Sequence, residues 1–426
     1  MKTTRTTIFA PWRWPLLAFS VATIAALSCA RAAAGPGGAE RAAEAQGREP
    51  DLRVGLALQV GRAVIGGQGD VAVIQGGRPA FRMRAGQTVT LVPEGRGLAV
   101  SGAHSGRYEA LAFSSLTRDA RITVAGKAYR GVVEVIARDG ALNVINALPL
   151  EQYLMGVVNA EMGRQGADAR AALEAQAIVS RTYALRNAGR FAADGFDLRA
   201  GVSDQVYGGV EFETEVGVAA VRATTGVVLT YRGHLITPFF HSTCGFSTAA
   251  PEEVFRTVRG EPYLKPVSDR RPGGGHYCDI SPRFRWTVVW DGDVLRDILR
   301  RTLPAVVGID GDAVTELRDV YIRRTGASGR PTDVRVRVRD GEIPVAGHDF
   351  RSVFETPDGT PLGSGAVALQ AERRGDRVGR LTASGRGWGH GVGMCQWGAV
   401  GRARAGQHAR TILTTYFPGT SFARRY

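Results

Sequence analysis

A glutamate at the end of an apolar segment is the first residue suited to acid–base chemistry. Glu161 directly follows the mostly apolar run 157–160. Burial in apolar surroundings disfavours a carboxylate and raises the pKa of the carboxyl group, as a general acid requires. A solvated glutamate at a helix end would show the same spacing. On spacing alone, that second interpretation is favoured.

A second group of polar residues interrupts an alanine-rich segment. Gln176, Ser180 and Arg181 lie within the otherwise mainly apolar run 175–185. In a helix, Gln176 and Ser180 are one turn apart and share a face with Tyr183. Polar groups on a packed helix need partners, which a substrate, a neighbouring loop or a buried structural network could supply.

Two histidines and two cysteines have the residue types of a zinc site. His241 and Cys244 form an H-x-x-C pair, and His276 and Cys278 form an H-x-C pair. Together they could bind zinc tetrahedrally, although both spacings are irregular for that metal. A Cys244–Cys278 disulfide is the alternative in an exported protein, and it leaves Cys395 unpaired.

A glycine-rich segment contains another histidine. Residues 385–393 hold five glycines in nine positions, with His390 among them. Such density allows the backbone to approach a ligand or another chain closely. His390 could be catalytic, a ligand, or simply hydrogen-bonded within a turn.

The elements that must position these residues are strands followed by helices. Residues 51–147 contain short β-rich segments separated by glycines, with a hairpin turn at Asp139-Gly140. Helical spacing begins at Leu148, and a small helical portion extends over residues 148–189. Strand patterns return at 223–240, 284–290 and 316–345. This order predicts an α+β fold that is rich in strands.

The N-terminus predicts export. Three basic residues precede an apolar run at 14–27, and Ala30-Arg31-Ala32 offers a cleavage site, so residues 1–32 are interpreted as a signal peptide. Residues 33–50 show no periodic pattern and are expected to form a flexible linker. Cys29 lies in a sequence resembling a lipoprotein cleavage box, so lipid anchoring in the membrane is an alternative. We expect the protein in the cell envelope.

The composition of the chain limits the classes of molecule that it is expected to bind. The chain has 426 residues, 44% of them hydrophobic, and a formal net charge of +14. Lys2, Lys127 and Lys265 are its only lysines, so arginine supplies nearly all the positive charge. Loss of residues 1–32 removes four basic residues and leaves +10. Outside the cytoplasm this charge favours an anionic cell-wall polymer over nucleic acid. No Walker loop, His-Glu-x-x-His or Gly-x-Ser-x-Gly motif is present, and no cofactor is expected.

Several stretches, in this order, resemble the SpoIID/LytB family of stage II sporulation protein D and amidase-enhancer proteins. The resemblance extends from about Leu52 to Arg424. The matching stretches are Leu148–Met162, Ala172–Leu185, Gln205–Gly208, Phe240–Gly245, Tyr263–Lys265, Gly387–Ala399 and Tyr416–Gly419. No single stretch is decisive, and the specificity comes from their number and order.

The resemblance implies a peptidoglycan lytic transglycosylase that acts on glycan strands stripped of their peptides. It implies a two-lobed catalytic region with a central cleft, spanning residues 148–426 with a β-rich insertion at about 300–380. Glu161 corresponds to the family's catalytic glutamate. The residues expected to bind substrate are Arg181, Gln205, His241, Ser242, Tyr263, Lys265 and His390.

The chain also departs from the family pattern. Gly163 stands where proline usually follows the Glu-Met pair, and Phe246 replaces a common second glycine. Residues 201–204 contain neither cysteine nor histidine, so the metal site that some members carry there is expected to be absent. The alternative function is a non-catalytic wall-binding protein that recruits or activates a cell-wall amidase. Glu161, Arg181 and Lys265 together favour the enzyme.

Overall fold

The computed structural model describes residues 47–258 and 260–426. The predicted signal peptide, Cys29 and residues 33–46 of the predicted linker lie outside the described residues. Glu49 lies in the last part of the predicted linker. Its carboxylate accepts a hydrogen bond from the backbone N–H of Glu151 at 2.7 Å. No helix of the described residues has the length and apolar character needed to cross a membrane.

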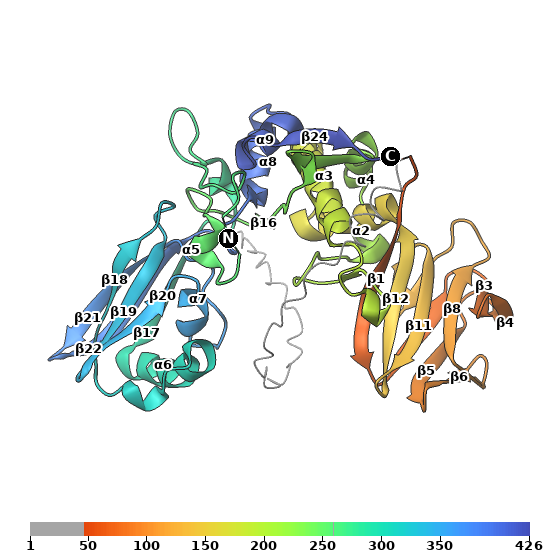
Figure 1. The fold of residues 1–426 in the computed structure, drawn as a ribbon, viewed down its shortest axis with the longest axis horizontal. Coiled ribbons are helices and arrows are strands. Elements are labelled where there is room, and N and C mark those ends of the chain that lie inside the picture. The colour runs from red at the N-terminus through yellow and green to blue at the C-terminus, as the bar shows by residue number, and fades with distance from the viewer. Residues whose placement is uncertain (1–46, 259) are drawn as a thin grey trace, which may run out of the picture.

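The first lobe is built from two antiparallel-rich sheets (Figure 1). One has the order β13-β1-β12-β11-β8-β3-β4, and the other has the order β10-β9-β2-β5-β6-β7. The strands of the first sheet are β1 (Asp51–Val60), β3 (Val71–Gln75), β4 (Arg78–Met83), β8 (Ala110–Ser115), β11 (Val132–Arg138), β12 (Ala141–Pro149) and β13 (Leu198–Arg199). Those of the second are β2 (Ala63–Gly67), β5 (Thr88–Glu94), β6 (Gly97–Gly102), β7 (Gly106–Tyr108), β9 (Ile122–Val124) and β10 (Lys127–Tyr129).

The expected hairpin turn at Asp139-Gly140 is confirmed. It joins β11 to β12, with Arg138 paired to Ala141. Asp139 has φ 51° and Gly140 has φ 76°, the positive values that a two-residue turn of this kind needs. The turn fixes the register of β12, whose end leads directly into the first helix.

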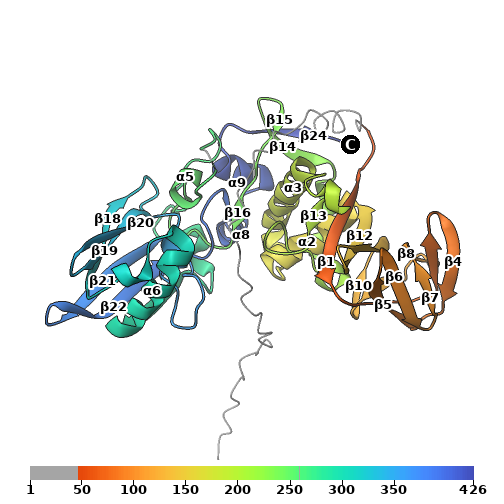
Figure 2. The same cartoon turned by 60° about the horizontal axis from the view of Figure 1, so that its bottom comes forward.

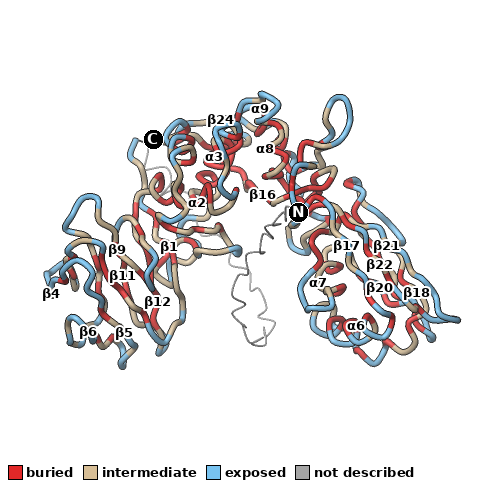
Figure 3. Tube along the Cα trace, turned by 180° about the vertical axis from the view of Figure 1, so that it is seen from behind, coloured by how far each residue is buried: buried red, intermediate tan, exposed pale blue. Residues whose placement is uncertain are grey.

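A layer of helices completes the first core. The helices are α2 (Leu150–Met162), α3 (Arg170–Asn187), α4 (Glu215–Ala223), α8 (Gln396–Arg404) and α9 (Ala409–Tyr416). The predicted apolar face of α2 is confirmed, because Leu150, Tyr153, Leu154, Val157 and Val158 are all buried. Helix α3 is the centre of this layer and packs against the other four helices. Figure 3 shows buried chain running through α2, α3 and α8.

Short strands join distant parts of the chain beside these helices. β14 (Val227–Tyr231) pairs with β15 (His234–Leu235) and with β24 (Ser421–Arg424). β16 (Phe240–His241) pairs in parallel with β23 (Met394–Cys395), which brings the histidine motif beside the end of the glycine-rich segment. The short helix α5 (Pro251–Val254) follows β16.

The second lobe has a hydrophobic core of its own, which includes Trp290, Leu299, Val334, Phe350 and Leu381. Its elements are β17 (Arg285–Asp291), α6 (Gly292–Val307), β18 (Leu317–Thr325), β19 (Pro331–Val338), β20 (Gly341–Ala346), α7 (Phe350–Val353), β21 (Val367–Arg374) and β22 (Arg377–Arg386). The two lobes lie on opposite sides of the helical layer (Figures 1 and 2). The α+β class is therefore confirmed, while the central cleft stays a prediction.

Helix α6 was not expected in this lobe. Its buried residues Leu295, Ile298, Leu299, Thr302 and Leu303 follow helical spacing, so the helix covers the sheets with one apolar face. The lobe also begins before residue 300, since Arg285 of β17 pairs with Arg386 of β22.

Candidate active site

Glu161 lies in the last turn of α2. The helix ends at Met162, its last turn holds no basic residue, and Gly163 follows with φ 69° and ψ 174°. The C-terminal end of a helix carries partial negative charge and therefore disfavours a carboxylate. The position of Glu161 on the helix thus favours the protonated acid.

Burial raises the pKa of Glu161 from its ordinary value to about 7. Two hydrogen bonds act in the opposite direction, one from the backbone N–H of Val206 and one with the side chain of Gln396. The Val206 nitrogen lies 2.6 Å from Oε1 of Glu161. A carboxyl group with this pKa exists in both protonation states near neutral pH, as acid–base catalysis requires.

The amide side chain that contacts this carboxyl group, Gln396, begins a chain of polar contacts. Gln396 lies 3.5 Å from Gln176, which donates to Ser180 at 3.0 Å. The carbonyl oxygen of Gln205 accepts a hydrogen bond from the hydroxyl of Tyr153. Its buried amide nitrogen has no partner among the described residues. Gln205 therefore lies next to Val206, which bonds to Glu161, and holds a buried donor that has no partner among the described residues.

Gln396 is a site residue that the sequence interpretation missed. It is the first residue of α8 and directly follows Cys395. The signal was present, since Gln396 lies within the stretch Gly387–Ala399 that resembles the family. Its role was hidden because only the fold brings α8 to the end of α2.

Asp204, the acidic residue that precedes Gln205, already has partners. The carboxylate of Asp204 accepts hydrogen bonds from the hydroxyl of Tyr183, from Arg190 and from the backbone of Arg199. Among the described residues, no neighbouring charge contributes to the pKa shift of Glu161. Within residues 47–258 and 260–426, Glu161 therefore has no second carboxylate coupled to its ionisation.

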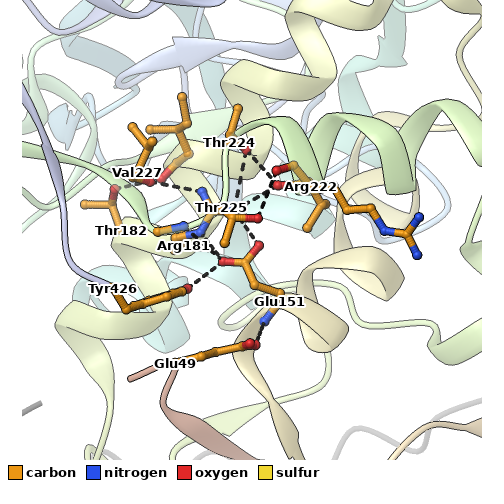
Figure 4. A network of polar contacts seen from close by, with 12 residues as sticks. Glu49, Glu151, Arg181, Thr182, Arg222, Thr224, Thr225, Val227 and Tyr426 are labelled. Atoms are coloured by element: carbon orange, nitrogen blue, oxygen red, sulfur yellow. Dashed lines mark hydrogen bonds and ion pairs between the residues drawn. The ribbon is translucent and has the colours of Figure 1, made fainter. Parts of the chain in front are cut away.

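Arg181 occupies a different place from the one expected. Its guanidinium is fully buried and forms a two-pronged ion pair with Glu151, at 2.6 and 2.7 Å (Figure 4). It also donates to the carbonyl of Val227, and the hydroxyl of Tyr426 donates to Glu151 at 2.5 Å. These contacts join α2, α3, β14 and Tyr426 into one buried network.

This position separates Arg181 from the catalytic candidate. Glu151 and Glu161 are ten residues apart on α2, which is about 15 Å along a helix axis. Because the guanidinium is enclosed and paired at the far end of α2, the structure makes Arg181 a positioning residue. The sugar contact expected from the sequence does not fit this environment.

Tyr263 and Lys265 have unlike environments. Tyr263 is buried, its hydroxyl accepts a hydrogen bond from the backbone N–H of Thr237, and its ring lies 5.4 Å from that of Tyr231. Lys265 is exposed, and within the described residues its ammonium forms no ion pair. Lys265 can therefore reach a ligand, while Tyr263 holds the segment in place.

His241 and His390 form a pair with ring centres 5.5 Å apart. Nδ1 of His241 lies 3.1 Å from the carbonyl of Val392, and Nε2 of His390 lies 2.8 Å from the carbonyl of Phe240. Burial is the main cause that lowers the pKa of each to about 3. Both rings are therefore neutral at physiological pH.

Ser242 lies beside this pair and contacts the next residue. Its hydroxyl is 3.2 Å from that of Thr243, and its carbonyl accepts from the backbone N–H of Trp397. Ser242 thus links β16 to the start of α8.

The glycine-rich segment approaches the protein's own chain. Gly393 has φ 72°, and a β-carbon there would collide with the carbonyl oxygen of Phe239. A β-carbon on Gly391 would lie against the guanidinium of Arg330. The glycines therefore allow the segment to pack closely between β16 and the second lobe.

The four residues considered for zinc do not come together. Cys244 and Cys278 lie side by side, with sulfurs 3.5 Å apart. His241 is instead bonded to Val392, and His276 precedes a short 3-10 helix at Tyr277–Ile280, where its backbone N–H donates to the carboxylate of Asp279. Asp269 and Cys395 take the places expected for the two histidines.

Comparisons with known proteins assign the chain to a family. The family model described as stage II sporulation protein matches residues 138–231, which contain α2, α3 and Glu161. A domain of unknown function matches residues 275–393, which contain the second lobe. The chain therefore belongs to the SpoIID family.

Three relatives show the extent of the similarity. An uncharacterised protein of Brachyspira hyodysenteriae is 30% identical over 340 residues, covering 78% of this chain and 81% of that protein. The amidase enhancer of Bacillus subtilis is 28% identical, covering 71% of this chain but only 45% of the relative. Stage II sporulation protein D of the same species is 27% identical, covering 66% and 76%.

Proposed function

We propose that this protein is a peptidoglycan lytic transglycosylase. It cleaves the bond between MurNAc and GlcNAc in peptide-denuded glycan strands and leaves 1,6-anhydro-MurNAc ends. The observation that carries the proposal is the isolated carboxyl group of Glu161, with its pKa raised to about 7. Glycosidases that use water generally employ two carboxyl groups, whereas this site offers one.

One carboxyl group is sufficient for the proposed reaction. Protonated Glu161 donates its proton to the glycosidic oxygen, and the bond from that oxygen to C1 of MurNAc breaks. The resulting carboxylate accepts the proton of the C6 hydroxyl of the same sugar. The C6 oxygen bonds to C1 and closes the anhydro ring. Glu161 ends protonated again, and no water is consumed.

The other residues bind and orient the glycan in this proposal. Removing a stem peptide leaves a free lactyl carboxylate on MurNAc, and the exposed ammonium of Lys265 is suited to pair with it. Gln205 is fully buried, so its unpartnered amide nitrogen reaches a sugar oxygen only when the adjoining segment moves. Ser242, His241 and His390 provide neutral polar groups, while Tyr263 and Arg181 hold the elements in place.

The proposal also includes the cellular location of the protein and its protein partner. The basic and apolar N-terminal pattern supports export to the cell envelope, with lipid anchoring through Cys29 as the alternative. One relative is named an amidase enhancer, which supports a cell-wall amidase as a partner. Such a partner and glycan cleavage are compatible in one protein.

The test is mass spectrometry of digests of denuded glycan in ¹⁸O-labelled water. We expect reducing ends to be anhydro-MurNAc without label. Glu161→Gln should lower the rate by about 10²- to 10⁴-fold. Glu215→Gln, which changes an exposed glutamate in the first turn of α4, should retain the rate. Labelled, hydrated reducing ends would overturn the proposal.

The amidase partner is tested separately. Purified cell-wall amidase is assayed on intact peptidoglycan with the wild-type protein and with Glu161→Gln. Stimulation that survives in the variant, without glycan cleavage, would separate the two roles. Stimulation together with a wild-type digest that releases no glycan would support the non-catalytic alternative.

A further inference from the structure

Three thiols and one carboxylate meet in the interior of the protein. Cys244, Asp269, Cys278 and Cys395 are fully buried, and their ligand atoms all lie within 4.8 Å of one another. They come from four separate segments: the loop after β16, the loop before the 3-10 helix at Tyr277–Ile280, that helix itself, and β23. The proposed glycan cleavage uses none of these four groups.

We propose that these four side chains bind one zinc ion. Three thiolates and one carboxylate are a ligand set that zinc accepts in tetrahedral structural sites. With zinc–sulfur bonds of about 2.3 Å, tetrahedral ligand atoms lie about 3.8 Å apart. Atoms as far apart as 4.8 Å would need to move together by roughly 1.0–1.3 Å. Small side-chain rotations provide that movement.

A disulfide accounts for less of this arrangement. The sulfurs of Cys244 and Cys278 are 3.5 Å apart, well beyond the bond length of about 2.05 Å. A bond between them would leave the thiol of Cys395 and the carboxyl of Asp269 buried against it. A metal ion uses all four groups.

The groups around the ligands are already arranged as an outer shell. Oδ1 of Asp269 accepts hydrogen bonds from Tyr416 at 2.8 Å and Arg402 at 3.3 Å. The sulfur of Cys395 accepts from the backbone N–H groups of Cys244 and Gly398, both at 3.2 Å. Such outer contacts orient metal ligands and stabilise their charged forms.

The local charge also fits a metal centre. Zinc with three thiolates and a carboxylate retains two formal negative charges. Two buried arginines stand beside it, Arg402 on Asp269 and Arg330, which donates to the carbonyl of Cys244 at 2.9 Å. Nε and Nη1 of Arg330 have no partner among the described residues. An anionic centre offsets the cost of burying this guanidinium.

The proposed zinc has a structural place next to the catalytic candidate. The sulfur of Cys395 caps the N-terminus of α8, and the next residue is Gln396, which bonds to Glu161. Four protein ligands leave no open position, so the ion acts by fixing the segments it joins. This inference does not depend on the transglycosylase reaction.

The experiment measures metal in the full chain, purified with its thiols kept reduced and without chelator. We expect about one equivalent of zinc by elemental mass spectrometry. Replacement by Co²⁺ should give the visible bands of tetrahedral cobalt and a thiolate charge-transfer band. Cys395→Ser should lose the metal and these bands. Cys29→Ser, which changes the remaining cysteine of the chain, should retain both.

A milder variant covers the case in which Cys395→Ser does not fold. Tyr416→Phe removes only the hydroxyl on Asp269 and should weaken zinc binding about 10- to 100-fold in chelator competition. Unchanged affinity in Tyr416→Phe would contradict the outer shell. A folded wild-type protein without zinc, whose mass and peptide map show a Cys244–Cys278 disulfide, would overturn the proposal.

Discussion

The backbone N–H of Val206 donates a hydrogen bond of 2.6 Å to the carboxylate of Glu161. This bond favours the ionised acid, yet the pKa of Glu161 is still raised to about 7 because burial outweighs it. The contact fixes the carboxyl group at the end of α2 beside Gln205. Position and pKa therefore come from the same packing, in which α2 ends against the loop at 205–206.

The raised pKa predicts how stability depends on pH. An unfolded glutamate ionises near pH 4.5, whereas folded Glu161 ionises near 7. The folded state is therefore penalised as pH rises from about 4.5 to about 7, by about 3 kcal/mol in total. Chemical denaturation of wild type and Glu161→Gln at pH 5 and pH 8 checks this. The variant should gain stability relative to wild type at pH 8, and equal differences at both pH values would contradict the shift.

Removing Arg181 should destabilise the fold. Arg181→Met leaves the carboxylate of Glu151 buried without its partner, which costs about 3–5 kcal/mol of unfolding free energy. Adding Glu151→Leu should recover part of that loss. Arg170→Met, at the exposed start of the same helix, should cost about 0.5 kcal/mol or less. Urea denaturation distinguishes these outcomes. If Arg181→Met is stable but binds glycan less well, the direct contact between Arg181 and the sugar would be supported instead.

The position after the Glu-Met pair should accept only glycine without a loss of stability. Gly163 has φ 69° and ψ 174°, a conformation in which other residues cost about 1–3 kcal/mol. Gly163→Ala should lose that amount although space is open around it, and Gly163→Pro should lose more because proline requires a negative φ. Gly61→Ala, also in open space but without positive φ, is the control. Thermal unfolding reports all three.

The two lysines outside the predicted signal peptide form a matched pair. Both Lys265 and Lys127 are exposed, so replacing either by methionine should change stability by less than about 0.5 kcal/mol. Under the proposed function, only Lys265→Met should raise KM for denuded glycan. Equal kinetics in the two variants would remove Lys265 from the binding site.

Local patterns in the sequence predicted the elements well. The apolar spacing of α2, the alanine-rich α3 and the turn at Asp139-Gly140 are all visible as periodicity or turn residues, and each is confirmed. Helix α6 was missed although Asp291-Gly292 separates it from β17 and Asp291 caps its first turn. Its apolar stripe was readable from spacing alone.

Contacts between distant segments were the part that the sequence left open. Arg181 interrupts an apolar run in the same way whether it faces a sugar or a buried Glu151, and only the packing of α3 on α2 decides between them. The same holds for Gln396, which reaches Glu161 across 235 positions of sequence. Cysteine spacing likewise could not reveal that Asp269 and Cys395, in place of two histidines, stand beside Cys244 and Cys278.

The two ends of the segment that forms the second lobe lie side by side. The carbonyl of Phe284 accepts a hydrogen bond from the N–H of Gly387 at 2.9 Å, and Arg285 pairs with Arg386. A segment with adjoining ends and its own core has the form of a module that evolution can exchange or resize without unravelling its host. Arg330 ties this module to the thiol cluster, so a replacement module would need to bring an equivalent cation.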